Sequence, residues 1–225
     1  MINEMGILER KWRKPGLRLV AFDMDGVLAK NTSSWSYIHH AFNVKNDKNL
    51  QAYVRGEIDY EGFMKKDIGL WVDVQDARAK IVDLLNMAPL MGGAPETVME
   101  LKNMGYRTAI ISAGLLILAE RLKTELGIDR ILANDLKVDG SGNLTGEGIK
   151  AVELKDKRPA LKQLARLEKI PRRSMAYVGD SAFDVPLFGK VGKSIAFNPS
   201  SPIVAGAADV AVYGDDLRRI LRHLA

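Results

Sequence analysis

The second half of the chain alternates short apolar runs, which favour strands, with amphipathic stretches, which favour helices. An earlier apolar run of the same kind ends at Phe22. Such alternation is typical of an α/β fold, a doubly wound parallel sheet with a Rossmann-like core, in which functional residues lie at the carboxyl ends of the strands. The predicted strands cover residues 18–22, 107–111, 174–178, 194–197 and 208–212.

Residues 33–90 interrupt this pattern, because they show helical periodicity with no convincing strand between the helices. We therefore expect a small helical domain over 33–90, inserted after the first strand of a discontinuous core made of residues 1–32 and 91–225. Further along, the Asp-Gly-Ser-Gly turn inside residues 136–152 predicts a β-hairpin.

The composition of the chain narrows the classes of function. With no cysteine, disulfides and thiolate metal sites are excluded, so a metal would be held by carboxylates or histidines. The net charge of +5 is dispersed apart from a basic run near the start, which argues against specific nucleic-acid binding and suits a small anionic substrate equally well. Without an apolar run of about 18 residues or a secretory leader, we expect no membrane span and a cytoplasmic location.

Polar residues follow the predicted strands at the points where these end. Asp23 and Asp25 come after the first strand, Ser112 after the second, and Asp180 and Asp184 after the third. A lysine, Lys155 or Lys157, lies at the start of a predicted helix. Because the carboxyl ends of parallel strands share one edge of the sheet, these groups are expected to converge.

The residue types suit phosphoryl transfer. Asp23 can attack phosphorus while Asp25 shuttles a proton, and Asp25 can deprotonate the water that hydrolyses the resulting aspartyl phosphate. Asp180 beside Asp23 would hold Mg²⁺, and Asp184, four residues on, would steady that site. The lysine and the Ser112 hydroxyl would neutralise the phosphoryl oxygens.

This order of motifs resembles the haloacid dehalogenase superfamily of phosphohydrolases, from residue 18 to nearly the end of the chain. "GEIDYEGF", "LKNMGYRTAIISAG", "GNLTGE", "DKRPALKQL" and "VGDSAFDVPLF" resemble the phosphoserine phosphatase branch, whose helical cap corresponds to residues 33–90. The resemblance implies Asp23, Asp25, Ser112 and Lys157 as catalytic residues, Lys157 being favoured over Lys155. It also implies Asp23, Asp25, Asp180 and Asp184 as metal ligands, with Ala113 and Gly114 next to the substrate.

Two positions depart from that branch. Thr32 stands where those enzymes have a substrate-contacting glutamate, and Asp67 stands where they have an arginine that grips the substrate carboxylate. Both are predicted to line the substrate site. Lys65 or Lys66 could replace the arginine, although a lysine lacks its two-pronged geometry. We therefore expect phosphoserine to be a poor substrate.

The predicted function is a Mg²⁺-dependent phosphatase that hydrolyses a small phosphorylated metabolite through an aspartyl phosphate. A true phosphoserine phosphatase is one alternative, and a phospho-receiver signalling module or a catalytically silent binding protein are others. A receiver has its acidic pair on the first strand, its phosphoacceptor on a later one and no helical insert, which fits this chain poorly. The identity of the metabolite and the choice between monomer and homodimer stay open.

Overall fold

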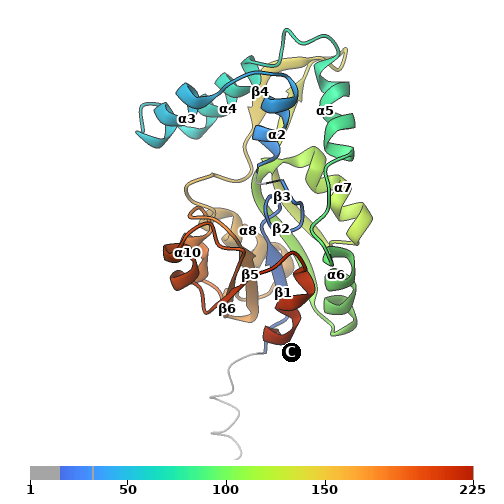
Figure 1. The fold of residues 1–225 in the computed structure, drawn as a ribbon, viewed down its shortest axis with the longest axis vertical. Coiled ribbons are helices and arrows are strands. Elements are labelled where there is room, and N and C mark those ends of the chain that lie inside the picture. Colours follow the sequence, from blue (N-terminus) through green and yellow to red (C-terminus); the bar gives the residue numbers. More distant parts are fainter. Residues whose placement is uncertain (1–15, 32, 225) are drawn as a thin grey trace, which may run out of the picture.

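The computed structural model describes residues 16–31 and 33–224 and contains a seven-stranded sheet (Figure 1). The strand order is β4-β3-β2-β1-β5-β6-β7, and only β4 is antiparallel to its neighbour. The predicted α/β fold is confirmed. The strands are β1 (Leu19–Phe22), β2 (Arg107–Leu115), β3 (Arg130–Val138), β4 (Leu144–Ile149), β5 (Met175–Gly179), β6 (Lys193–Phe197) and β7 (Val210–Val212).

The central strand, β1, is apolar along its whole length and fully buried, as expected of a parallel strand covered on both faces. It pairs with β2 on one side and β5 on the other, so that Phe22 lies opposite both Ile110 and Val178. The chain builds β2 to β4 on one side of β1 and β5 to β7 on the other. The strand order therefore reverses at the carboxyl end of β1, which is where such sheets bind ligands.

The core helices form two groups with the sheet between them (Figure 1). Helices α6 and α7 contact each other in one group, and α9 contacts both α8 and α10 in the other. The segment after β7, expected to be an α-helix, is a 3-10 helix. The elements are α6 (Ala94–Asn103), α7 (Leu116–Leu126), α8 (Arg158–Glu168), α9 (Val185–Phe188), α10 (Pro202–Ala207), η1 (Arg172–Ser174) and η2 (Leu217–His223).

The described part of residues 33–90 forms the predicted helices, α2 (Ser34–Ala41), α3 (Asp47–Val54), α4 (Tyr60–Gly69) and α5 (Ala77–Asn86). Ser33 and Asp59 begin α2 and α4 by accepting hydrogen bonds from backbone amides of the first turn. Helix α3 packs on α4, and α5 lies beside α7 (Figure 1). We call α2 to α4 the cap helices. The exact limits of a separate cap domain stay a prediction.

The predicted hairpin is present as β3 and β4, with Asp139 closing the turn by accepting hydrogen bonds from the amides of Ser141 and Asn143. Strand β4 packs against α4, so the hairpin joins the cap helices to the sheet. A Cβ atom on Gly148 would lie 2.3 Å from Cε of Met64, which explains why glycine stands at this contact. Among the described residues, none of the helices has the length and apolar character needed to cross a bilayer.

Candidate active site

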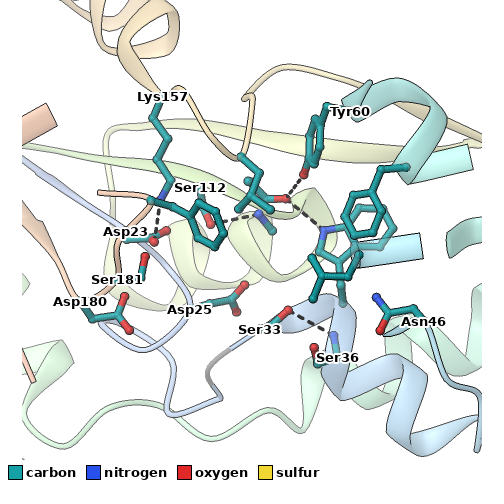
Figure 2. A pocket seen from close by; sticks show the side chains of 17 residues that line it. Asp23, Asp25, Ser33, Ser36, Asn46, Tyr60, Ser112, Lys157, Asp180 and Ser181 are labelled. Carbon is teal, nitrogen blue, oxygen red and sulfur yellow. Dashed lines mark hydrogen bonds and ion pairs between the residues drawn. The ribbon is translucent and has the colours of Figure 1, made fainter. Parts of the chain in front are cut away.

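Asp23, the first residue after β1, is bonded to a buried lysine (Figure 2). Its Oδ1 accepts a hydrogen bond from the amide of Met24 at 2.7 Å, and its Oδ2 accepts one from Nζ of Lys157 at 2.6 Å. Lys157 immediately precedes α8 and is almost fully buried. Lys155 instead donates to the carbonyls of Tyr53 and Val54. Of the two candidate lysines, the structure therefore brings Lys157 to Asp23.

Asp184 holds this lysine from the other side. Its Oδ1 accepts hydrogen bonds from Nζ of Lys157 and Oη of Tyr177, both at 2.7 Å, and its Oδ2 accepts from the amides of Asp180 and Ser181. Although burial acts to raise the pKa of Asp184, the Lys157 ammonium lowers it below the usual value. Asp184 therefore positions both the lysine and the loop that follows β5.

Asp180 completes a group of three carboxylates. Single oxygens of Asp23, Asp180 and Asp184 all lie within 4.8 Å of one another. Burial, together with the charges of Asp23 and Asp184, raises the pKa of Asp180 to about 8. Burial also raises the pKa of Asp23 to about 7, against the opposing effect of Lys157. A single ammonium does not balance three clustered carboxylates, so the group can hold an additional cation.

The backbone next to Asp23 leaves room for Asp180. Gly26 has a φ of +76°, and a Cβ atom there would lie 2.4 Å from Oδ2 of Asp180. A side chain at position 26 would therefore be strained by its backbone and would displace a carboxylate of the group.

Asp25 is turned away from the carboxylate group and toward the start of α2. Its oxygens accept hydrogen bonds from Nδ2 of Asn31 at 2.7 Å and Oγ of Ser34 at 2.9 Å. The predicted binding of a metal by this carboxylate does not fit that placement. Burial raises the pKa of Asp25, although the bonds from Ser34 and Asn31 act to lower it. A carboxyl group with a raised pKa holds a proton more readily than an exposed one, which suits a group that gives and takes protons.

Ser112, Ala113 and Gly114 lie in the last part of β2, which runs further than the predicted strand. The amide of Gly114 donates to Oγ of Ser112 at 3.1 Å, which leaves the hydroxyl proton for another acceptor. A Cβ atom on Gly114 would lie 2.6 Å from both Oδ2 of Asp25 and Oγ of Ser34. Glycine is therefore required for α2 to approach the strand end.

The carbonyl oxygen of Ala113 joins the cap helices to β2. It accepts hydrogen bonds from Nε1 of Trp35 at 3.0 Å and Oη of Tyr60 at 3.1 Å (Figure 2). It also accepts one from Nδ2 of Asn134 at 3.0 Å. The sequence interpretation assigned no role to Tyr60 or Asn134. In a sequence, a tyrosine at the start of a helix or an asparagine within a strand looks the same whether its side chain bonds to a backbone carbonyl or only packs in the core.

Asp23, Asp25, Ser112, Lys157 and Asp180 line one cavity of about 240 Å³ between the strand ends and the cap helices. Figure 2 shows Asp23 and Asp180 on one side of it and Asn46 on the other. Among the described lining residues, Lys157 is the only one with a cationic side chain. The rest of the lining includes Trp35, Asn46, Leu50, Tyr60 and Phe63 from the region of the cap helices, and Phe183 from the loop that follows β5.

Asp67 does not line this cavity. Its side chain is fully buried on α4, and its oxygens accept hydrogen bonds from Nε2 of His39, Nδ2 of Asn46 and Nδ2 of Asn49. The predicted direct contact of Asp67 with the substrate is therefore wrong in this geometry. An influence on the substrate has to pass through Asn46, which does line the cavity.

The two lysines that could have replaced the arginine do not reach the cavity either. Lys65 and Lys66 are exposed and line no part of the cavity, and Lys65 pairs with Glu147. Neither lysine therefore replaces the missing arginine. Thr32, the other predicted substrate contact, lies outside the described residues, as does the whole basic run near the start.

Comparison with known sequences agrees with this site. The sequence model described as haloacid dehalogenase-like hydrolase matches residues 20–189, well over half of the chain. The chain belongs to the haloacid dehalogenase-like hydrolases. Within that family, the phosphoserine phosphatase of Methanocaldococcus jannaschii is 32% identical over 210 residues, which cover 92% of this chain and 97% of that protein. The phosphoserine phosphatase of Idiomarina loihiensis is 29% identical over 206 residues, or 90% and 91% of the two chains.

Solved structures of haloacid dehalogenase-like hydrolases share the fold. A substrate-bound phosphoserine phosphatase complex has a TM-score of 0.77 and 31% identity, covering 93% of this chain and 99% of that one. A phospho-aspartyl intermediate analogue of phosphoserine phosphatase matches with the same TM-score and identity. The predicted enzyme class, a phosphatase, is confirmed, and these relatives do not favour the receiver module.

Proposed function

We propose that this hydrolase removes phosphate from small phosphomonoesters through a phosphorylated Asp23. The observation that carries the proposal is the position of Asp23 at the carboxyl end of β1, where the strand order reverses. There Asp23 is bonded to Lys157 and lies next to Asp180. The resemblance to a phosphatase solved as a phospho-aspartyl intermediate analogue supports the same intermediate.

In the first half of the reaction, a carboxylate oxygen of Asp23 attacks the phosphorus atom of the substrate. The bond between phosphorus and the ester oxygen breaks, and Asp25 donates its proton to that oxygen, so the leaving group departs as an alcohol. Lys157 and the free hydroxyl proton of Ser112 stabilise the negative charge on the phosphoryl oxygens.

In the second half, water attacks the phosphorus atom of the phosphorylated Asp23. Asp25, now a carboxylate, accepts a proton from this water, while the bond between phosphorus and the Asp23 oxygen breaks. Inorganic phosphate is released and Asp23 returns to its carboxylate form. One buried carboxyl group thus serves as acid and then as base, which fits the raised pKa of Asp25.

We infer that the cofactor is Mg²⁺, since the available donors are carboxylate oxygens. Asp23 and Asp180 would hold it, since each Asp23 oxygen accepts only one hydrogen bond, whereas each oxygen of Asp184 accepts two or more, so Asp184 supports the site through Lys157 and the loop after β5. A bound Mg²⁺ supplies charge that screens the repulsion between the phosphate dianion and the Asp23 carboxylate.

The enclosed position of the site points to a small soluble substrate. The cap helices and the residue before α3 contribute Trp35, Asn46, Tyr60 and Phe63 to the cavity, and its volume of about 240 Å³ has to hold the whole phosphomonoester. Because Lys157 is already paired with two carboxylates, the described lining residues offer no free cation to a substrate carboxylate. Phosphoserine is therefore expected to be a poor substrate here, although the relatives named above are phosphoserine phosphatases.

Phosphate release from a panel of phosphorylated metabolites tests this proposal. The purified protein with Mg²⁺ should hydrolyse at least one small phosphomonoester, and the Asp23→Asn variant should release no phosphate from it above background. Equal phosphate release by both proteins, each purified to constant specific activity, would contradict the assignment of Asp23 as the nucleophile. No release from any substrate would overturn the proposal.

A further inference from the structure

The orientation of the Asn46 amide is set by a buried carboxylate. Asn46 precedes α3 but makes no capping bond to it, and its Nδ2 donates instead to Oδ2 of Asp67 at 2.8 Å. An ionised carboxylate accepts hydrogen bonds only, so the amide nitrogen has to face Asp67. Within the described part of the chain, no donor bonds to Oδ1 of Asn46. Asn46 therefore offers a hydrogen-bond acceptor to the cavity.

The bonds around His39 show that Asp67 carries its charge. Nε1 of Trp71 donates to Nδ1 of His39 at 3.0 Å, and an indole nitrogen can only donate. Nδ1 therefore bears no proton, and Nε2 is the nitrogen that donates to Asp67 at 3.0 Å. Asn49 is the third neutral donor. Three donors thus face the two oxygens of Asp67, as suits an ionised carboxylate, and no Lys or Arg of the described residues pairs with it, so its negative charge lies directly behind Asn46.

The positive ends of two cap helices are already used by carboxylates. Asp25 bonds to Ser34 in the first turn of α2, and Asp67 bonds to Asn46 and Asn49 at the start of α3. These bonds run to side chains and bring a carboxylate of the protein close to the start of each helix, where an anion is favoured. Neither helix therefore provides a site for a carboxylate on the substrate.

Apart from Leu50, Leu154, Ser33 and Ser36, the remaining wall of the cavity is aromatic. Trp35, Tyr60, Phe63 and Phe183 line it, and Trp35 is supported by a stacked contact with Trp71 at a ring-centroid distance of 5.3 Å. Aromatic faces attract ammonium groups through their quadrupole. A neutral acceptor, a buried negative charge and several aromatic rings thus surround the space for the leaving group.

We propose that this enzyme prefers phosphate esters of amino alcohols, whose ammonium group donates to Oδ1 of Asn46 and lies against the aromatic wall. This substrate class rests on the phosphatase function proposed above. The amide dipole of Asn46 presents its negative end to the ammonium, and the Asp67 charge behind it acts in the same direction. A carboxylate in that place would meet repulsion from both groups.

Four phosphomonoesters separate this inference from the proposed function. O-phosphoethanolamine and ethyl phosphate differ by the ammonium group, phosphoglycolate carries a carboxylate, and p-nitrophenyl phosphate reports general phosphatase activity. We expect kcat/KM for O-phosphoethanolamine to exceed that for ethyl phosphate by about tenfold or more, the range for one hydrogen bond to a charged group, and phosphoglycolate to be poorer than ethyl phosphate.

The outcomes distinguish the two claims. Hydrolysis of p-nitrophenyl phosphate without a preference for O-phosphoethanolamine over ethyl phosphate would overturn the inference and leave the phosphatase function standing. A preference for phosphoglycolate would also overturn it. No hydrolysis of any of the four esters would overturn the proposed function and the inference together.

Two variants locate the preference in the structure. Asn46→Leu removes the acceptor at similar size and should lower the kcat/KM ratio of O-phosphoethanolamine to ethyl phosphate about tenfold. Asp67→Asn removes the buried charge and allows the Asn46 amide to turn, so it should lower the same ratio. The matched control, Asn86→Leu at the exposed end of α5, should keep the wild-type ratio. An unchanged ratio in Asn46→Leu would contradict the assignment, even if Asp67→Asn fails to fold.

Discussion

Nζ of Lys157 lies 2.6 Å from Oδ2 of Asp23, and both side chains are buried. The lysine is shared with Asp184, while Asp180 stands close by without an ammonium partner among the described residues. Burying charges away from water is costly unless they are paired. The excess of carboxylates over ammonium groups therefore favours either the uptake of protons or the binding of a cation. The predictions on the nucleophile, the lysine and the metal follow from it.

Asp23→Asn should reduce turnover of any accepted phosphomonoester by at least about a thousandfold, because an amide oxygen cannot replace the carboxylate as a nucleophile. The fold should persist, since Lys157 keeps its bond to Asp184. Steady-state phosphate release and a thermal melt measure the two effects. More than about a tenth of the wild-type rate would contradict the assignment of Asp23.

Lys157→Met should lower stability by up to about 3–5 kcal/mol, because it leaves Asp23 and Asp184 buried without their cation. The loss should be smaller at pH 6 than at pH 8, since protonation relieves unpaired carboxylates as the pH falls. Urea unfolding at the two pH values measures the difference.

The matched control is Lys155→Met. It removes an amine that donates hydrogen bonds to the backbone carbonyls of Tyr53 and Val54, the last two residues of α3. It should cost less and show no such dependence on pH. Equal losses for both variants would argue against a charge-specific role of Lys157.

The metal affinity should fall as the pH is lowered from 8 to 6. In the metal-free protein, burial raises the pKa of Asp180 to about 8 and that of Asp23 to about 7, so both carboxyls take up protons within this range. Metal binding requires the ionised forms and releases these protons. The expected loss is up to about tenfold in affinity per pH unit for each proton released, as measured by calorimetry with Mg²⁺. An affinity that does not change with pH would show that these carboxyls are not the ligands.

Gly114→Ala should reduce both stability and activity, since the added Cβ atom would lie 2.6 Å from Asp25, Met24 and Ser34 atoms. The loss of stability is expected to be about 1–3 kcal/mol, as for other overpacked sites. Gly206→Ala on α10 is the control, because nothing lies within 4 Å of its Cβ position, and it should be neutral or slightly stabilising. Similar melting temperatures for the two variants would contradict the described approach of α2 to β2.

The polar residues at strand ends were predictable because parallel strands bring their carboxyl ends to one edge. Asp23, Ser112 and Asp180 therefore meet as expected, from positions far apart in the sequence. Strand β3 was predicted only in its last residues, since Asn134 and Asp135 interrupt its apolar pattern. Asn134 is nevertheless fully buried, and both ends of its amide make hydrogen bonds that no sequence pattern reveals.

The direction of the Asp67 side chain was missed, although the sequence holds a signal for it. Asp67 is spaced three or four residues from Met64, Phe63 and Trp71, so it shares the apolar face of α4. That periodicity predicts burial. What it could not predict is the set of donors from α2 and α3 that stabilise the buried charge.

The central claim is that Asp23 carries the phosphoryl group during turnover. Rapid acid quenching of the enzyme as it hydrolyses an accepted phosphomonoester with Mg²⁺, followed by peptide mass spectrometry, tests it most directly. We predict that one phosphoryl group is found on the peptide that contains Asp23, and that none is found in Asp23→Asn. Phosphorylation of a different residue, or fast phosphate release from an enzyme that is never phosphorylated, would contradict the account.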